Sequence, residues 1–173
     1  MPTNRQKTTD VDLSAIIEGL IKADVQFILV GGLAAVIQGA PVMTMDVDIV
    51  HNQSTENISK LLNFLRSINA IYRRPDNKII EPKEEDFSEM GHVLLTTRLG
   101  PLDVLAFIEE GKTYGDLFPH SIEIEFRDYK IRVLDIKILT ELKRISKSPK
   151  DKQRLAVLEE TLRQLEEEKL NNK

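Results

Sequence analysis

The sequence of 173 residues contains no cysteine. This absence excludes disulfide bonds, thiolate zinc sites and a cysteine nucleophile, and it is compatible with a reducing compartment. The chain also lacks an excess of basic residues, since 24 Lys and Arg stand against 28 Asp and Glu, for a net charge of −4. That balance argues against a protein that coats nucleic acid through non-specific phosphate contacts.

Long hydrophobic runs are missing as well. No stretch approaches the ~18 apolar residues that a membrane-spanning helix needs, and the polar residues 1–12 contain no apolar run typical of a signal peptide. We therefore expect a cytoplasmic protein with no membrane partner. The content of 41% hydrophobic and 30% charged residues is typical of a globular chain, and the length predicts about one domain with a helical appendage.

The first half of the chain predicts two helices around a buried strand. Apolar spacing over residues 13–21 indicates an amphipathic helix. The continuous apolar run 27–30 indicates a strand buried on both faces, and it ends at Gly31 and Gly32. We expect a short helix over residues 33–38 after these glycines.

The rest of the chain alternates short strands and helices, which predicts an α/β or α+β protein. In chain order the expected elements are a strand over 46–50, a helix from Ser54 or Thr55 to Ile68, a surface loop over 73–91, strands over 92–97 and 102–107, strands over 122–126 and 129–134, a helix capped by Asp135 and a final helix beginning at Ser148 and Pro149.

Polar and apolar residues alternate over residues 46–50. As a strand, this segment buries Val47 and Ile49 on one face and presents Asp46 and Asp48 together on the other. An acid-x-acid pair alone is a weak signal, because roughly 4.5 are expected by chance at this composition. Three further pairs follow no glycine exit from a buried strand and are interpreted as solvated surface: Asp10 with Asp12, Glu84 with Asp86, and Glu123 with Glu125.

Two aspartates on one strand face repel each other unless a cation lies between them. A hard divalent ion such as Mg²⁺ prefers carboxylate oxygens and completes its shell with water or phosphate oxygens. Gly31 and Gly32 let the backbone approach phosphates closely, beside the free N–H groups that begin the following helix. The pattern therefore indicates a site for a metal ion and a nucleotide.

Gly31-Gly32, thirteen intervening residues and Asp46-Val47-Asp48 together resemble the signature of the polymerase-β-like nucleotidyltransferase superfamily. Asp103 falls where that family places its third carboxylate, on a later strand. The segments 142–144 and 150–151 are similar to the helical tail of small prokaryotic nucleotidyltransferase-like proteins related to abortive-infection and toxin-antitoxin systems.

The resemblance implies transfer of a nucleoside monophosphate from a nucleoside triphosphate to an acceptor hydroxyl. Asp46, Asp48 and Asp103 are then the catalytic residues and the ligands of Mg²⁺ or Mn²⁺. The nucleotide contacts implied are Gly31, Gly32, Thr44, Lys143 and Lys150. The acceptor stays open between a protein, an RNA and a small molecule.

One position departs from the family. Many relatives carry an Arg just before the Thr that precedes the first Asp, whereas this chain has the stretch 41–44, Pro-Val-Met-Thr. A cation near the triphosphate would then have to come from elsewhere in the chain. The candidates in the sequence are Arg73, Arg74, Lys143 and Lys150.

The resemblance also implies the fold: a nucleotidyltransferase domain over residues 1–134, with a small mixed β-sheet flanked by helices, and a C-terminal helical segment over residues 135–173 packed on it. The last helix carries a stripe of Leu155, Leu158, Leu162 and Leu165. Such a stripe packs either on the domain or against a second chain, so a homodimer is a possible partner arrangement.

Two other function classes compete with the enzyme. The first is a nucleotidyltransferase-like module without catalysis, which binds nucleotide or regulates a toxin-antitoxin pair. The second is a structural interaction protein that uses its leucine stripe and leaves the aspartates solvated. Mg²⁺-dependent nucleotide binding distinguishes the first two classes from the third, and turnover distinguishes the enzyme from the binding module.

Overall fold

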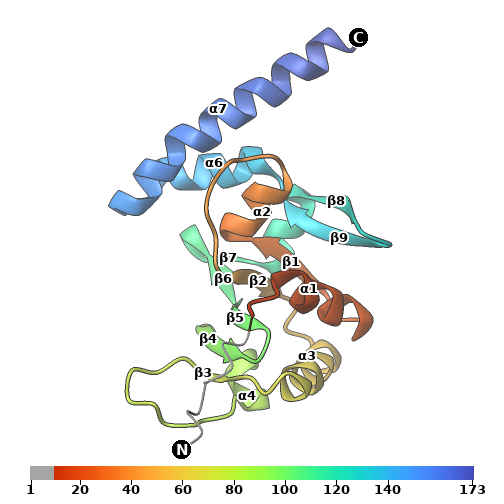
Figure 1. Cartoon of the computed structure of the whole chain (residues 1–173), viewed down its shortest axis with the longest axis vertical. Coiled ribbons are helices and arrows are strands. Elements are labelled where there is room, and N and C mark those ends of the chain that lie inside the picture. The colour runs from red at the N-terminus through yellow and green to blue at the C-terminus, as the bar shows by residue number, and fades with distance from the viewer. Residues whose placement is uncertain (1–9) are drawn as a thin grey trace, which may run out of the picture.

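The structure is a computed structural model and describes residues 10–173 (Figure 1). Its strands are β1 (Phe27–Val30), β2 (Val47–His51), β3 (Ile71–Tyr72), β4 (His92–Thr97), β5 (Gly100–Leu105), β6 (Phe107–Ile108), β7 (Lys112–Thr113), β8 (Ser121–Phe126) and β9 (Tyr129–Leu134). Its α-helices are α1 (Leu13–Lys22), α2 (Gly31–Ile37), α3 (Thr55–Ser67), α4 (Glu84–Ser88), α5 (Tyr114–Leu117), α6 (Ile136–Ile145) and α7 (Pro149–Asn171), with 3₁₀ turns η1 (Glu109–Gly111) and η2 (Phe118–His120).

Seven of these strands form one mixed sheet in the order β3-β4-β5-β2-β1-β9-β8. Strands β1 and β2 are antiparallel, whereas β2 runs parallel to β5 and β1 runs parallel to β9. The hairpins β4–β5 and β8–β9 extend the sheet on either side. This architecture confirms the predicted mixed α/β class, and it puts β2 and its two aspartate positions at the centre of the sheet.

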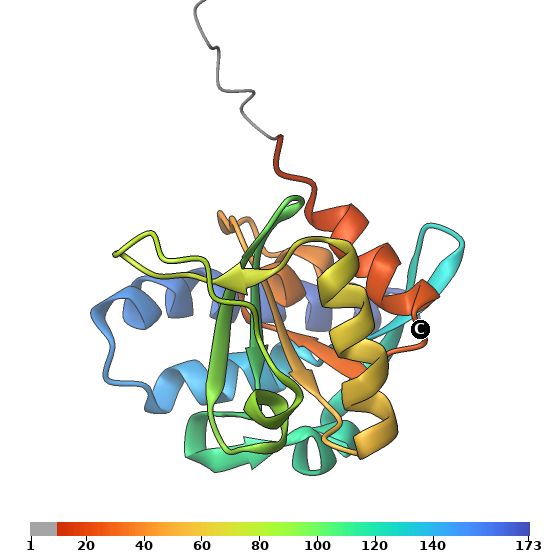
Figure 2. The same cartoon turned by 90° about the horizontal axis from the view of Figure 1, so that it is seen from below.

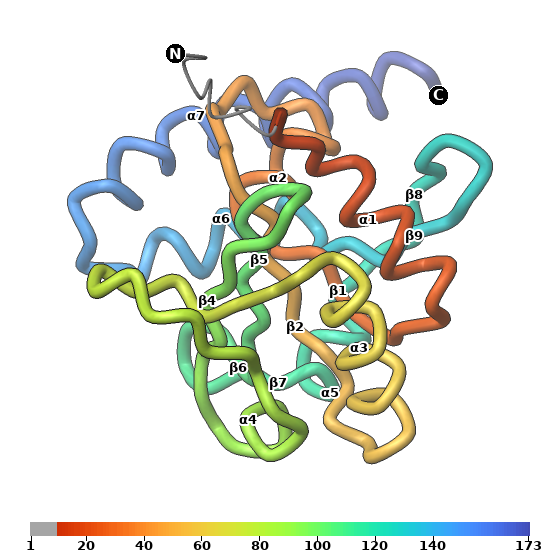
Figure 3. The backbone as a smooth tube through the Cα atoms, turned by 60° about the horizontal axis from the view of Figure 1, so that its bottom comes forward, coloured from red at the N-terminus to blue at the C-terminus, as the bar shows by residue number. Residues whose placement is uncertain are grey.

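Helices cover both faces of the sheet. Helices α1 and α3 lie side by side on one face, and α6 and α7 lie on the other (Figures 2 and 3). All four residues of β1 are buried, as expected for a strand between two helical layers. The core between sheet and helices contains Ile16 and Leu20 of α1 and Leu61 and Leu65 of α3, all completely buried.

Helix α2 begins earlier than the sequence pattern predicts. The expected helix started at Leu33, but Gly31 and Gly32 already form the first turn. Gly31 adopts φ of +70°, a left-handed value that a residue with a Cβ avoids. The glycines therefore turn the chain directly from β1 into α2, with no intervening loop.

The predicted surface loop over residues 73–91 contains a short helix, α4, with one buried anchor. Phe87 is completely buried, and its carbonyl accepts a hydrogen bond from His51 Nε2 at 2.9 Å. The other ring nitrogen of His51 lies 3.2 Å from the Leu105 carbonyl. The many charged residues of this segment predict only a surface loop, but the single buried side chain of Phe87 is enough to attach the segment to the core.

The C-terminal helices α6 and α7 pack against each other and onto the domain. Within the leucine stripe, Leu158 is buried, and the partly buried Leu162 and Leu165 pack against the core. The stripe thus packs within the chain, and the distal end of α7 extends past the domain (Figure 1). Among residues 10–173, no helix is both long and apolar enough to cross a membrane.

Candidate active site

Strands β2 and β5 bring the three predicted aspartates together. Their parallel register pairs Asp48 with Asp103, and Asp46 lies immediately before β2, two residues from Asp48 on the same strand face. One carboxylate oxygen from each of the three residues lies within 4.8 Å of the others. The three carboxylates therefore lie together, although more than fifty residues of chain separate Asp48 from Asp103.

Gly31 makes room for the Asp48 carboxylate. A Cβ added to Gly31 would lie 2.2 Å from Asp48 Oδ2, far inside van der Waals contact. The position also has the left-handed φ described above. Both the backbone conformation and the close approach require glycine, so the first of the two predicted glycines shapes the aspartate cluster itself.

The second glycine lies against Thr44. A Cβ on Gly32 would lie 3.0 Å from Thr44 Oγ1, so the turn into α2 and the segment before β2 are in close contact. The Thr44 hydroxyl is within long hydrogen-bonding distance of two acceptors of Asp46. Its oxygen lies 3.3 Å from the Asp46 carbonyl oxygen and 3.4 Å from Asp46 Oδ1. Thr44 therefore orients Asp46 beside the glycine turn.

The crowding of carboxylates shifts the titration of Asp48. Burial, the negative charges of Asp46 and Asp103 and a hydrogen bond shared with Asp103 together raise the pKa of Asp48 to about 7, and burial is the largest of these causes. Lys143 opposes the shift weakly. A cluster that disfavours its own ionisation in this way is well suited to a divalent cation, which replaces the repulsion by attraction.

Arg73 neutralises one member of the cluster. Its Nη2 donates to Asp103 Oδ1 at 2.9 Å and to the Leu95 carbonyl at 2.8 Å. Arg74, by contrast, pairs with Asp76 within the surface segment and does not reach the aspartates. Of the two arginines considered from the sequence, only Arg73 therefore belongs to the site.

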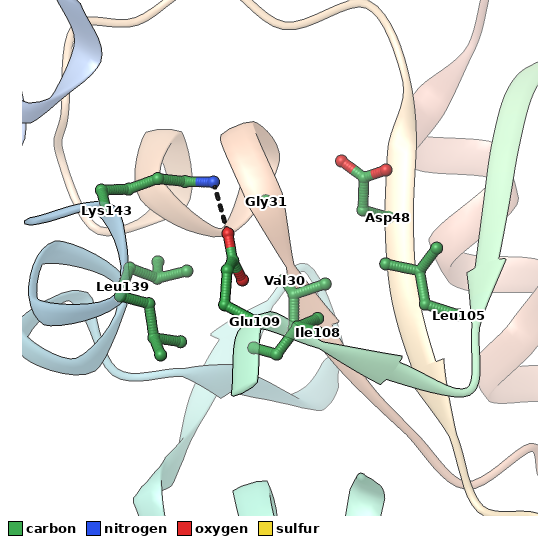
Figure 4. Close-up of a pocket in the computed structure, with 9 residues that line it drawn as sticks. Val30, Gly31, Asp48, Leu105, Ile108, Glu109, Leu139 and Lys143 are labelled. Carbon is green, nitrogen blue, oxygen red and sulfur yellow. Dashed lines mark hydrogen bonds and ion pairs between the residues drawn. The ribbon is translucent and has the colours of Figure 1, made fainter. Parts of the chain in front are cut away.

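A cavity of about 200 Å³ opens beside Asp48 (Figure 4). Its walls come from β1, the glycine turn, β2, β5, the β6–η1 segment and α6: Val30, Gly31, Asp48, Leu105, Ile108, Glu109, Leu139, Leu142 and Lys143. The walls are mainly aliphatic, with charged groups at Asp48, Glu109 and Lys143. A polar ligand group can therefore enter beside the aspartates while an apolar part contacts the leucines.

Lys143 crosses this cavity toward Glu109 (Figure 4). Its Nζ lies 3.0 Å from Glu109 Oε1 and 3.3 Å from Asp151 Oδ1. Burial alone would lower the pKa of Lys143, but the two carboxylates outweigh it and raise that pKa, so the ammonium group is charged. Glu109, in the turn between β6 and β7, therefore holds the Lys143 side chain in the cavity.

Lys150 lies apart from these residues. It is exposed in the first turn of α7 and does not line the cavity beside Asp48. Its neighbour Asp151 faces inward instead and pairs with Lys143 and with the Ser146 hydroxyl at 2.6 Å. The structure therefore brings Lys143, but not Lys150, to the aspartate cluster.

Solved structures of other proteins have folds similar to that of this chain. A lincosamide antibiotic adenylyltransferase, LnuA, crystallised with lincomycin, matches with a TM-score of 0.55 and 15% identity, over 84% of this chain and 92% of its own. A proposed nucleotidyltransferase from Thermotoga maritima matches with a TM-score of 0.51 and 18% identity, over 90% and 91% of the two chains. The chain has the polymerase-β-like nucleotidyltransferase fold. No protein-family model and no curated protein matches the sequence.

In a nucleotidyltransferase fold, the donor set of this cluster fits a hard divalent cation. Asp46, Asp48 and Asp103 offer carboxylate oxygens only, which Mg²⁺ and Mn²⁺ prefer over nitrogen or sulfur ligands. The three groups are half-buried, so water or phosphate oxygens can complete the coordination. The cluster therefore offers the kind of ligand atoms that the sequence predicted for a divalent metal ion.

Sequence reasoning missed Arg154. This residue of α7 donates from Nη2 to the Met43 carbonyl at 3.1 Å, and its Nη1 lies 3.3 Å from the Cβ position of Gly32. One signal could have found it, since Arg154 precedes the buried Leu158 by one helical turn and so shares its inward face. Arg154 lies on the side of the aspartate cluster where the stretch 41–44 has no basic residue.

Proposed function

We propose that this chain is a metal-dependent nucleotidyltransferase that transfers a nucleoside monophosphate from a nucleoside triphosphate to an acceptor hydroxyl. The observation that carries the proposal is the cluster of Asp46, Asp48 and Asp103, whose carboxylate oxygens lie within 4.8 Å of one another in a nucleotidyltransferase fold. The alternative of merely solvated aspartates is disfavoured, because burial and mutual repulsion raise the pKa of Asp48 to about 7.

The aspartates have separate roles in this proposal. Asp46 and Asp48 hold the metal ion that carries the triphosphate, and Asp103 completes a second metal position on the acceptor side. Mg²⁺ or Mn²⁺, when bound there, neutralises phosphate charge and polarises the phosphorus that is attacked. Thr44, through its contact with Asp46, keeps the first carboxylate in place.

The chemical step is a substitution at the α-phosphorus. The acceptor oxygen forms a bond to that phosphorus, the bond to the bridging oxygen breaks, and pyrophosphate leaves with the electron pair. Asp103 orients the acceptor hydroxyl and receives its proton. Gly31 and Gly32 allow the backbone to lie close to the phosphates, and Lys143 is the basic residue that lines the cavity beside Asp48 and can pair with them.

The experiment uses α-labelled ATP, GTP, CTP and UTP with Mg²⁺ and fractionated lysate, and measures label transferred to protein, RNA or small molecules. We expect label in one fraction with the wild-type chain and none with Asp48→Asn or Asp103→Asn. The matched control is Asp128→Asn, which removes an exposed carboxylate in the turn between β8 and β9 and should transfer label normally. Equal labelling by all four proteins would contradict the proposal.

A second candidate is a nucleotide-binding module without turnover, including a regulatory partner in a toxin-antitoxin pair. Two observations favour it: residues 41–44 contain no basic side chain, and Arg73 is paired with Asp103. Such a module would bind nucleoside triphosphate in a Mg²⁺-dependent way and transfer no label. The same labelling experiment, combined with a binding measurement on the same protein, distinguishes the two candidates.

A further inference from the structure

We propose that Arg154 of α7 supplies the cation that binds the triphosphate on the Gly32–Thr44 side of the site. This inference rests on the proposed function and deepens it, because it names a phosphate-binding residue from a helix outside the strands that carry the aspartates. It follows that α7 is part of the nucleotide site and does more than cover the core.

The position of the guanidinium group is the first support. Arg154 Nη1 lies 3.3 Å from the Cβ position of Gly32, and a Cβ there would also lie 3.0 Å from Thr44 Oγ1. Thr44 in turn contacts Asp46. The guanidinium group, the glycine turn and the hydroxyl that orients the first aspartate are therefore immediate neighbours, and a small cavity is lined by Gly31, Gly32, Lys143 and Arg154 among others.

Charge is the second support. The two other cations near the aspartates are already paired, Lys143 with Glu109 and Asp151, and Arg73 with Asp103. Within residues 10–173, Arg154 has no carboxylate within ion-pairing distance, and its hydrogen-bond partner is the Met43 carbonyl. The charge of Arg154 helps to lower the pKa of Asp151, but no carboxylate of the described residues forms an ion pair with Arg154, so the arginine can bind a phosphate group without first losing one.

The chemistry of arginine is the third support. A guanidinium group has five N–H donors in a planar fork and can bind two phosphate oxygens at once. The bond to Met43 uses one donor and fixes the direction of the fork, while the others stay free for phosphate oxygens. The helix is held in register, since Leu158, one turn further along, is buried in the core.

The competing explanation is a structural one, in which the hydrogen bond from Arg154 to the Met43 carbonyl only attaches α7 to the segment before β2. The two explanations differ in what they require of the side chain. An attachment requires a donor to the Met43 carbonyl, whereas a phosphate contact requires a positive charge. Arg154→Lys keeps the charge, Arg154→Gln keeps a neutral donor, and Arg154→Met removes both.

The experiment measures Kd with Mg²⁺ for the α,β-nonhydrolysable analogue of the best-bound nucleoside triphosphate and for the matching monophosphate. We expect Arg154→Gln and Arg154→Met to weaken triphosphate binding about tenfold, to change monophosphate binding less than about threefold, and to flatten the salt dependence. Arg154→Lys should restore most of the affinity. Arg163→Gln is the control, because Arg163 lies on the same helix, exposed and paired with Glu160.

Three results would overturn the inference: triphosphate affinity unchanged in both neutral variants, an equal loss for triphosphate and monophosphate, or loss of folding in both neutral variants by circular dichroism. If these occur while wild-type protein binds triphosphate and transfers label, the proposed function stands and only the role of Arg154 is wrong. If wild-type protein binds no nucleotide with Mg²⁺, the proposed function fails and the role of Arg154 fails with it.

Discussion

Replacing Asp48 by Asn should stabilise the metal-free protein while abolishing its response to Mg²⁺. Burial, with Asp46 and Asp103 nearby, raises the pKa of Asp48 from the ordinary 3.8 to about 7. At about 1.4 kcal/mol per pKa unit, ionising this group in the folded chain costs about 4 kcal/mol of stability once the pH exceeds 7. Asn has nearly the same shape and no charge, so it fits against Gly31 without the repulsion.

The direction in which stability changes with pH follows from the proton that Asp48 binds in the folded chain. Between pH 3.8 and about 7 the folded chain holds a proton on Asp48 that the unfolded chain has lost, so stability falls as the pH rises through this window. The gain from Asp48→Asn should therefore be largest at pH 8, about 4 kcal/mol, and smaller at pH 5, less than about 2 kcal/mol. This pH dependence separates charge relief from an unrelated improvement in packing.

The assay is urea unfolding with EDTA at pH 5 and pH 8, repeated with Mg²⁺. Wild-type protein should gain stability on adding Mg²⁺, and the variant should not, because it lacks one of the metal ligands. Asp128→Asn, at an exposed turn, is the control for a change in net charge. A variant that is less stable than wild type at pH 8 and still gains stability from Mg²⁺ would refute the reasoning.

Three further predictions concern neighbouring features. Gly31→Ala should destabilise the fold by about 1–2 kcal/mol in thermal unfolding and weaken Mg²⁺ binding, because Ala resists φ of +70° and its Cβ would displace Asp48; unchanged binding would contradict this. Arg73→Met should tighten Mg²⁺ binding by about threefold in calorimetry, since Arg73 competes for Asp103, and weaker binding would count against the competition. Leu158→Ala should cost about 2–5 kcal/mol, whereas Leu170→Ala at an exposed position should cost almost nothing; equal effects, or a change in sedimentation, would place the stripe in a dimer interface instead.

Local patterns account for the part of the site that the sequence predicts. The alternation around Asp46 and Asp48 depends only on the two-residue period of a strand, and the buried run before Gly31 depends only on hydrophobicity. The pairing of β2 with β5, which brings Asp103 beside Asp48, is a long-range register. No local period encodes that register, and it was expected only from the family resemblance.

The features that sequence reasoning missed depend on contacts between distant segments. Glu109 reaches Lys143 because the β6–β7 hairpin turns back toward α6, and Arg154 reaches Met43 because α7 docks across the segment before β2. The apolar stripe of α7 predicted its inward face and not its docking angle. The burial of Phe87 was missed for the same reason, because it depends on contacts with distant residues, whereas the charge of its own segment predicted only a surface loop.

The proposed function requires that Asp46, Asp48 and Asp103 hold a divalent metal ion in contact with a nucleotide phosphate. Paramagnetic resonance of the protein with Mn²⁺ and a nonhydrolysable nucleoside triphosphate tests it most directly, through the hyperfine coupling between Mn²⁺ and phosphorus. We predict a ³¹P coupling typical of direct phosphate coordination in wild-type protein, lost in Asp48→Asn and retained in Asp128→Asn. A spectrum of Mn²⁺ that the Asp48→Asn substitution leaves unchanged would contradict metal binding by the three aspartates.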